Sequence, residues 1–218
     1  MTIFNILKFF CDFQHGQHAP LVWRLAKATH LMKGPAEKNG DSELVKSLTY
    51  ETHGHAKKAL DLDENDPECH KWFAISVGSM NNYVKTKEKL ENGFKFKHHV
   101  DIALQGKPND ATLHHMLGRW AYELSSLSWL ERKAATAIFG SVPESSYKSA
   151  LSSLKTAHEL RPEWLDNILF VIKTLIAMNQ IEEAKDWLRK SNGIEPNGDS
   201  DFVIKKELHS LCKKYSVI

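Results

Sequence analysis

The strongest constraint on this chain is a pattern of small and large apolar residues that recurs about every 34 residues. The pattern is clearest near the C-terminus. Counted from Leu165, positions 7, 8, 11, 20, 24 and 32 are Val171, Ile172, Leu175, Ala184, Leu188 and Pro196. Two antiparallel helices approach closely only where small residues lie between their axes, and a proline after the second helix cannot continue it. The pattern therefore predicts repeated antiparallel helix pairs.

Three earlier units fit the same pattern if insertions are allowed, as in tetratricopeptide repeats. Units counted from Ala111 and Pro67 need insertions of about 20 and about 10 residues, and a weaker first unit needs about 14. We expect first helices near 19–34, 67–80, 111–124 and 165–178, and second helices near 42–63, 83–105, 144–160 and 181–192. The predicted fold is all-α, a right-handed α-solenoid of about four tetratricopeptide-like helix pairs with insertions. Gly118 and Ala150 should be close-packing sites.

Helix-capping residues stand near the predicted helix starts, at Asp41, Asp66, Asp110 and Ser145. A last helix over 200–215 should cover the end of the array, because a terminal repeat otherwise exposes its core. Its expected apolar face is Phe202, Val203, Leu208, Leu211 and Tyr215. The predicted domains are an amphipathic N-terminal segment with a connector (1–18), the repeat domain (19–198), and the capping helix with a C-terminal tail (199–218).

Composition describes an ordinary soluble domain, with 218 residues, 42% apolar and 26% charged. A net charge of +2 does not by itself indicate nucleic acid, and we expect no such partner. The three cysteines are scattered, which favours a reducing, cytoplasmic compartment.

The N-terminus carries apolar residues at positions 3, 6, 7, 10 and 13, the spacing of an amphipathic helix. The stretch is too short to span a bilayer and lacks the features of a signal peptide. Two interpretations stay open: the stretch docks on the first repeat, or it binds a membrane surface or a partner.

Motifs of enzymes, cofactor sites and metal sites are missing from the sequence. We found no phosphate-binding glycine loop, no H-E-x-x-H and no G-x-S-x-G. The adjacent pairs His98-His99 and His114-His115 should diverge on a helix, and no cysteine or carboxylate stands at ligand spacing. We therefore expect no catalysis, no cofactor and no metal.

Function in a helical solenoid usually lies on the concave face, which the first helix of each pair lines. The residues at those positions that we expect to bind a partner are Trp23, Lys27, His30, Lys71, His115, Arg119, Tyr122 and Lys173. This set is basic with interleaved aromatic residues, and such a face attracts acidic or extended peptides. The alternative is a solvated face without a binding role.

Two insertions add further candidates. A secondary basic stretch is formed by Lys85, Lys87, Lys89, Lys95 and Lys97, although its lysines alternate with acids as on a solvated helix face. The other insertion carries apolar residues that a repeat does not need, so they should bury against the repeats or a partner. These residues are Trp129, Leu130, Ile138 and Phe139.

Several motifs resemble the regulator of microtubule dynamics family, whose members carry a divergent tetratricopeptide-like domain. The resemblance covers about residues 20 to 195. Its most specific parts are the Lys-Trp-Phe-Ala block and the motifs within the insertions. The residues that carry it are 70–74, 94–99, 108–112, 117–120, 128–132, 143–147 and Ala150-Leu151.

The resemblance implies a non-catalytic, cytoplasmic protein of microtubules, the spindle and spindle poles, with tubulin and other spindle proteins as partners. Some longer relatives carry an N-terminal membrane anchor, which we do not expect here. Tubulin exposes acidic C-terminal tails, and a basic groove suits such a segment. Two rival functions stay open: a general peptide-binding adaptor that grips a carboxylate, and a lipid-binding module at organelle contacts.

Overall fold

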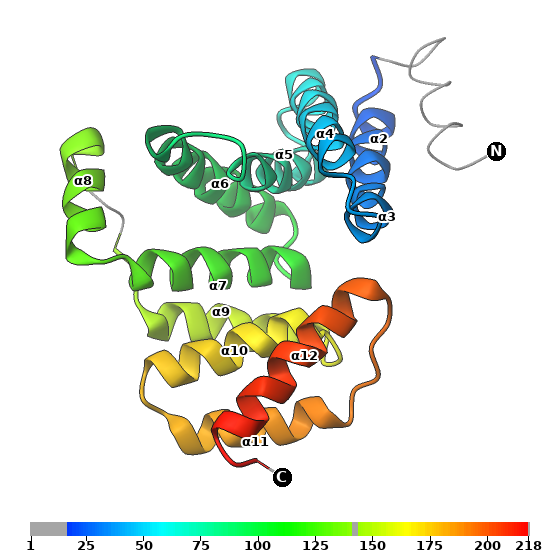
Figure 1. Ribbon diagram of the computed structural model, residues 1–218. Coiled ribbons are helices and arrows are strands. Elements are labelled where there is room, and N and C mark those ends of the chain that lie inside the picture. Colours follow the sequence, from blue (N-terminus) through cyan, green and yellow to red (C-terminus); the bar gives the residue numbers. More distant parts are fainter. Residues whose placement is uncertain (1–16, 141–143, 218) are drawn as a thin grey trace. The chain divides into compact units, whose positions relative to one another are not determined.

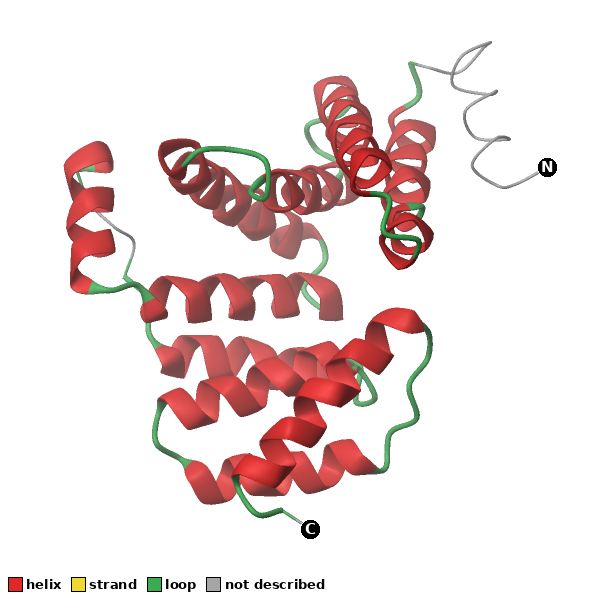
Figure 2. Ribbon diagram, viewed as in Figure 1, coloured by secondary structure: helices red, strands yellow, loops and turns green. Residues whose placement is uncertain are grey.

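The computed structural model describes residues 17–140 and 144–217, although not the side chains of residues 138 and 139. All regular elements in this part of the chain are helices, and the described residues form no strand (Figure 2). The predicted fold class of tetratricopeptide-like helix pairs is confirmed. The apolar N-terminal stretch at residues 3–13 lies outside the described residues.

The chain divides into two compact units, residues 1–108 and 109–218. Figure 1 labels the helices of the first unit, which fold back on one another in sequence. They are α2 (Ala19–Leu31), α3 (Lys33–Lys38), α4 (Ser42–Leu62), α5 (Pro67–Met80) and α6 (Thr86–Gly106). Helix α4 packs against both α2 and α5, and α6 packs against α5.

The second unit repeats this arrangement and ends with the predicted capping helix. Its helices are α7 (Ala111–Ser126), α8 (Trp129–Phe139), α9 (Tyr147–Leu160), α10 (Leu165–Ala177), α11 (Ile181–Asn192) and α12 (Asp199–Lys214). Helix α7 pairs with α9, α10 pairs with α11, and α12 packs across α10 and α11. Among helices α2 to α12, none has both the length and the apolar character needed to cross a bilayer.

Side-chain caps fix where several helices begin. The carboxylates of Asp41, Asp66 and Asp110 accept hydrogen bonds from backbone N–H groups in the first turns of α4, α5 and α7. These bonds satisfy donors that a helix start leaves free. Helix α9 is capped by Ser146, one residue beyond the predicted Ser145, whose hydroxyl instead donates to the carbonyl of Ala121.

Small residues occupy the predicted points of closest helix approach. Ala26 on α2 and Ala56 on α4 are both fully buried and share one core cluster with Trp72. In the second unit, a Cβ added to Gly118 on α7 would lie 2.6 Å from Leu154 Cγ and 3.1 Å from the Ala150 carbonyl oxygen, both on α9. The predicted close-packing role of Gly118 and Ala150 is therefore confirmed.

The three insertions are accommodated in different ways. The first adds the short helix α3 before α4, which runs for 21 residues. The second lengthens α6, also to 21 residues. The third forms a separate helix, α8, whose Ser128–Glu131 capping box closes its first turn. Extra residues therefore extend or add helices without disturbing the repeating contacts.

The capping helix α12 faces the core differently from the prediction. Leu208 and Cys212 are buried, and Ile204, Leu211 and Tyr215 pack against the same cluster. Phe202 and Val203 are instead 56% and 68% exposed, so their predicted place on the apolar face is wrong. The set that packs on the core begins at Ile204, one residue after Val203, and follows the helical spacing through Leu208 to Leu211 and Tyr215.

Replacing Gly118 with leucine tests this packing directly. Because the added side chain would enter space held by Leu154 and the Ala150 carbonyl, the free energy of unfolding should fall by roughly 1–3 kcal/mol. Urea denaturation of the whole chain measures the change. Gly54→Leu on α4 is the matched control, since a Cβ there meets nothing within 4 Å. Equal stability for the two variants would contradict the packing assignment.

Candidate partner-binding faces

In the second unit, a buried histidine joins α7 to α10. His115 is 4% exposed, and its ring lies 4.3 Å from that of Trp164 and edge-on to Phe170. Its Nδ1 lies 3.0 Å from Asn167 Oδ1, and its Nε2 lies 3.1 Å from Asp166 Oδ2. His115 therefore positions other residues of this face, while its own ring is closed off from solvent.

The amide of Asn167 orients this network. Its Nδ2 donates to the Leu154 carbonyl oxygen at 2.9 Å, which turns Oδ1 towards His115. Both ring nitrogens of His115 then face oxygen atoms, Nδ1 that of the Asn167 amide and Nε2 that of the Asp166 carboxylate. Burial works to raise the pKa of Asp166, but the hydrogen bond from His115 and the charges of His115, Arg119 and Lys173 outweigh it and lower that pKa.

The two cations predicted on this face, exposed Arg119 and half-buried Lys173, have carboxylate partners within the unit. Arg119 Nη1 lies 3.4 Å from Asp166 Oδ2, and the guanidinium lies over the Phe170 ring at 4.3 Å. Lys173 Nζ lies 2.7 Å from Glu207 Oε1 on α12. Much of the positive charge on this face is thus compensated locally, by Glu207 as well as by Asp166.

Tyr122 completes the second-unit face as a half-buried aromatic residue. Its ring lies 5.7 Å from those of Tyr147 and Phe170. Burial raises the pKa of the Tyr122 hydroxyl most strongly, and electrostatic interactions with Tyr147, Glu123 and Glu207 raise it further. Tyr122 therefore stays a neutral phenol, able to flank a bound segment.

In the first unit, Trp23, Lys27 and His30 follow one another along one face of α2. Trp23 is half-buried against the cluster of Ala26, Ala56 and Trp72, and Lys27 is exposed. The His30 ring contacts the edge of Trp72, with 5.9 Å between ring centroids. Burial, together with the charge of Lys33, lowers the pKa of His30 to about 4, so this imidazole is neutral at pH 7.

Lys71, the fourth predicted residue of this unit, lies on α5 beside acidic neighbours. Its ammonium is 4.0 Å from Glu68 Oε1, and the side chains are 13% and 16% exposed. Glu68 also binds Lys107. Lys71 is therefore partly compensated, in contrast to Lys27.

Sequence reasoning missed Lys33, which is 9% exposed. Its ammonium donates to Ser79 Oγ on α5 at 3.2 Å, and burial lowers the pKa of Lys33 despite the opposing charge of Glu37. The sequence carries no signal for this contact, because Ser79 lies 46 residues after Lys33, on another helix.

The secondary basic stretch lies along α6 and just before it. Lys85, Lys87, Lys89 and Lys95 are exposed, whereas Lys97 is paired with Asp101 at 2.5 Å. The first three lie at the start of α6, where the helix dipole disfavours positive charge. An anion bound near this helix start would compensate the positive charge of these lysines. The stretch therefore remains a secondary candidate for binding an acidic partner.

The insertion helix α8 presents two large apolar side chains to solvent. Trp129 is 67% exposed and Leu130 is 71% exposed, and Lys133 lies over the Trp129 ring at 4.1 Å. A hydrogen bond from Arg132 to the Leu124 carbonyl oxygen ties the helix to α7. Trp129 and Leu130 therefore do not bury against the repeats, and of the two expected locations only burial against a partner stays open for them. The side chains of Ile138 and Phe139 lie outside the described residues.

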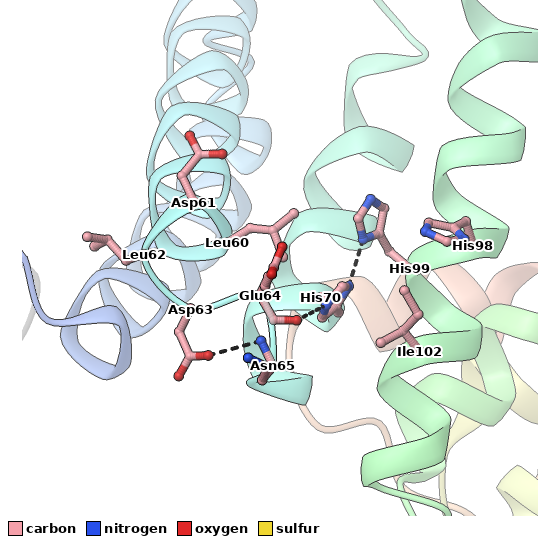
Figure 3. A pocket seen from close by; sticks show the side chains of 10 residues that line it. All are labelled: Leu60, Asp61, Leu62, Asp63, Glu64, Asn65, His70, His98, His99 and Ile102. Carbon is pink, nitrogen blue, oxygen red and sulfur yellow. Dashed lines mark hydrogen bonds between the residues drawn. The ribbon is translucent and has the colours of Figure 1, made fainter.

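The first unit also contains an open cavity of about 810 Å³ beside the end of α4 (Figure 3). Figure 3 shows His70 and His99 pointing towards each other, with 2.7 Å between their Nδ1 atoms, while His70 Nε2 donates to the Glu64 carbonyl oxygen. The other residues that line the cavity are Leu60, Asp61, Leu62, Asp63, Asn65, His98 and Ile102. Across residues 17–140 and 144–217, no three His, Cys, Asp or Glu side chains are grouped to hold a metal ion.

Comparison with known families identifies the domain. A family model described as "Regulator of microtubule dynamics protein 1-3" matches residues 2–216. The chain belongs to this family. The resemblance seen in the sequence motifs is thereby confirmed over nearly the full chain.

Individual members of the regulator of microtubule dynamics family share about a third of their residues with this chain. Protein 1 from Bos taurus is 31% identical over 207 residues, which are 94% of this chain and 64% of the bovine protein. Protein 1 from Caenorhabditis elegans is 30% identical over 194 residues, which are 89% of this chain and 84% of the nematode protein. Protein 3 from Xenopus laevis is 37% identical over 148 residues, which are 68% of this chain and 31% of the frog protein. The chain thus spans less than two thirds of the bovine and frog relatives.

The chain is also weakly similar to two solved structures. One is YrrB, described as a TPR protein with an unusual peptide-binding site, with a TM-score of 0.36 and 16% identity over 94% of this chain and 98% of that chain. The other is pilF of Pseudomonas aeruginosa, with a TM-score of 0.34 and 11% identity over 88% of this chain and 86% of that chain.

The network around His115 makes stability depend on Asp166. The pKa of Asp166 is lower in the folded protein than in the unfolded chain, so its contribution is complete above a pH of about 4 and is lost as the pH falls through the folded pKa. Asp166→Asn should lower the free energy of unfolding by about 1–3 kcal/mol at pH 7, and the difference from wild type should shrink in acid. Denaturation at several pH values measures both effects.

Asp186→Asn serves as the control for this variant. It breaks only the exposed ion pair with Arg189, which is worth about 0–1 kcal/mol. A stability loss for Asp166→Asn that is no larger than for the control, or that grows in acid, would contradict the proposed network.

Proposed function

We propose that this chain is a non-catalytic, microtubule-associated adaptor that binds microtubules or tubulin and supports microtubule dynamics. Membership of the regulator of microtubule dynamics family is the observation that carries this proposal. Tetratricopeptide-like helix pairs, which present side chains for protein recognition, agree with such a role.

The proposed binding is electrostatic and uses the basic helix faces. Tubulin exposes acidic C-terminal tails, and basic surfaces attract such segments and speed their association. The contact residues of the proposal are Trp23, Lys27, His30 and Lys71 in the first unit, and Arg119, Tyr122 and Lys173 in the second, with His115 holding Arg119 and Asp166 in place. The lysines from Lys85 to Lys97 form the secondary candidate.

The proposal extends to where the protein acts. A microtubule-binding adaptor of this kind acts in the cytoplasm, at the spindle and spindle poles, where it supports chromosome segregation and meets other spindle proteins. Fluorescence microscopy of the tagged chain in dividing cells tests this part. Uniform staining that does not follow microtubules would speak against it.

Co-pelleting with microtubules tests the binding itself. Because exposed charges are screened over about 8–10 Å at physiological salt, the bound fraction should fall steeply as salt is raised. It should also fall severalfold when the acidic tubulin tails are removed by limited proteolysis. The same protein without microtubules controls for sedimentation by aggregation. Binding that ignores both salt and tail removal would refute the electrostatic mechanism.

The exposed apolar residues of α8 favour a second candidate function, contact with a lipid surface. Trp129 and Leu130 lie beside Lys133, and such combinations of apolar and basic side chains suit a membrane interface. Under this alternative, Trp129→Ser/Leu130→Ser should reduce pelleting with anionic liposomes and leave microtubule pelleting unchanged. Wild-type protein that does not pellet with these liposomes would eliminate this candidate.

A further inference from the structure

Lys33 is a buried cation without a carboxylate partner among the described residues. Its ammonium has three N–H donors, and the described residues supply one acceptor, Ser79 Oγ. The Ser79 hydroxyl donates its own proton to the Ile75 carbonyl oxygen, so it offers Lys33 only a lone pair. Glu37 is the acid whose charge acts on Lys33, but it forms no ion pair with it among the described residues. Burying an ammonium in this way is unfavourable unless something else compensates its charge.

Helices α2 and α5, which flank Lys33 in sequence and in space, also carry buried polar atoms without partners among the described residues. The indole Nε1 atoms of Trp23 and Trp72 are buried, and residues 17–140 and 144–217 give them no acceptor. His30 Nδ1 is also buried without a partner in the described part of the chain, and an imidazole, which is never negatively charged, cannot serve as a counter-charge to Lys33. Lys27 lies one helical turn before His30 on the same side of α2, is exposed, and has no ion pair among the described residues. Among the described residues, neither Lys27 nor Lys33 is therefore paired with a carboxylate, and a ligand could supply one.

The other three cations predicted on the first-helix faces, Lys71, Arg119 and Lys173, do not share this property. Arg119 is paired with Asp166 and Lys173 with Glu207, and Lys71 has Glu68 beside it. A ligand must displace or outcompete those carboxylates before it gains the full attraction. Among the described residues, no paired carboxylate would compete with a ligand for Lys27 or Lys33.

We propose that an acidic peptide segment binds the face of the first unit formed by Trp23, Lys27, His30, Lys33 and Ser79, with one of its carboxylates accepting hydrogen bonds from the Lys33 ammonium. This rests on the proposed function and assigns that function's main contact to α2, α3 and α5. The long, flexible lysine stem lets the ammonium turn from Ser79 towards the ligand. Lys27 adds a second, exposed charge, and Trp23 gives an apolar wall for the peptide chain.

The proposal predicts an unusual combination of effects for Lys33→Met. Methionine fills a similar volume without the buried charge, so the melting temperature should stay the same or rise, while binding of an acidic peptide should weaken. A lysine kept only for structure would behave differently, because its removal would lower the melting temperature and leave binding unchanged.

The experiment compares wild type with Lys27→Gln/Lys33→Met. The probe is a fluorescent octaglutamate peptide, with octaglutamine as its uncharged counterpart and inorganic phosphate as a competitor at constant ionic strength. We expect at least a tenfold increase in Kd for octaglutamate, no binding of octaglutamine, and weak competition by phosphate. Lys148→Gln/Lys206→Met removes the same charge from exposed positions of the second unit and should bind like wild type.

Octaglutamate binding by Lys27→Gln/Lys33→Met equal to wild type would overturn the proposal, as would an equal loss in the second-unit control. Competition by phosphate as strong as that by octaglutamate would also overturn it, because the site would then take any small anion. Microtubule pelleting distinguishes a failure of the proposed function from a failure of this binding site. Wild type that does not pellet refutes the proposed function, whereas wild type and the double variant pelleting equally refutes only this site.

Discussion

The close approach of paired helices at small side chains is the contact on which the rest of this structure depends. Gly118 lets α9 come so near to α7 that a single added carbon would overlap Leu154. The fully buried alanines Ala26 and Ala56 serve the same purpose between α2 and α4. Because these contacts set the spacing of every pair, inserted residues are confined to helix ends and connections, where α3 and α8 form.

This spacing also decides which polar side chains meet. His115 reaches Asp166 and Asn167 only because α10 packs beside the α7–α9 pair, and Asn167 in turn reaches the Leu154 carbonyl oxygen on α9. Lys33 reaches Ser79 because α2, which leads into α3, packs beside α5. The charge of each predicted face thus depends on how the helices pack. Arg119 and Lys173 of the second unit are paired with carboxylates, whereas Lys27 and Lys33 of the first have no carboxylate partner among the described residues.

The fold could be predicted from the sequence because its rule is local and periodic. Small residues recur at fixed positions, and the predicted starts at Pro67, Ala111 and Leu165 match the observed helices. The candidate site was less predictable, since pairing depends on residues distant in sequence. Nothing in the repeat pattern places Glu207 beside Lys173, and nothing in it turns Lys33 inward. The exposure of Trp129 likewise depends on how α8 leaves α7, which insertion length alone does not fix.

The central claim is that the first unit supplies the uncompensated positive charge that an acidic partner contacts. Zero-length carbodiimide cross-linking to microtubules, followed by mass spectrometry, tests it most directly, because the reagent joins lysine amines only to carboxylates in direct contact. Lys27 and Lys33 should be the main lysines cross-linked to tubulin tail carboxylates, whereas Lys173 should be cross-linked to Glu207 of its own chain, its ion-pair partner. Tubulin cross-links confined to Lys173, or to the stretch from Lys85 to Lys97, would contradict it.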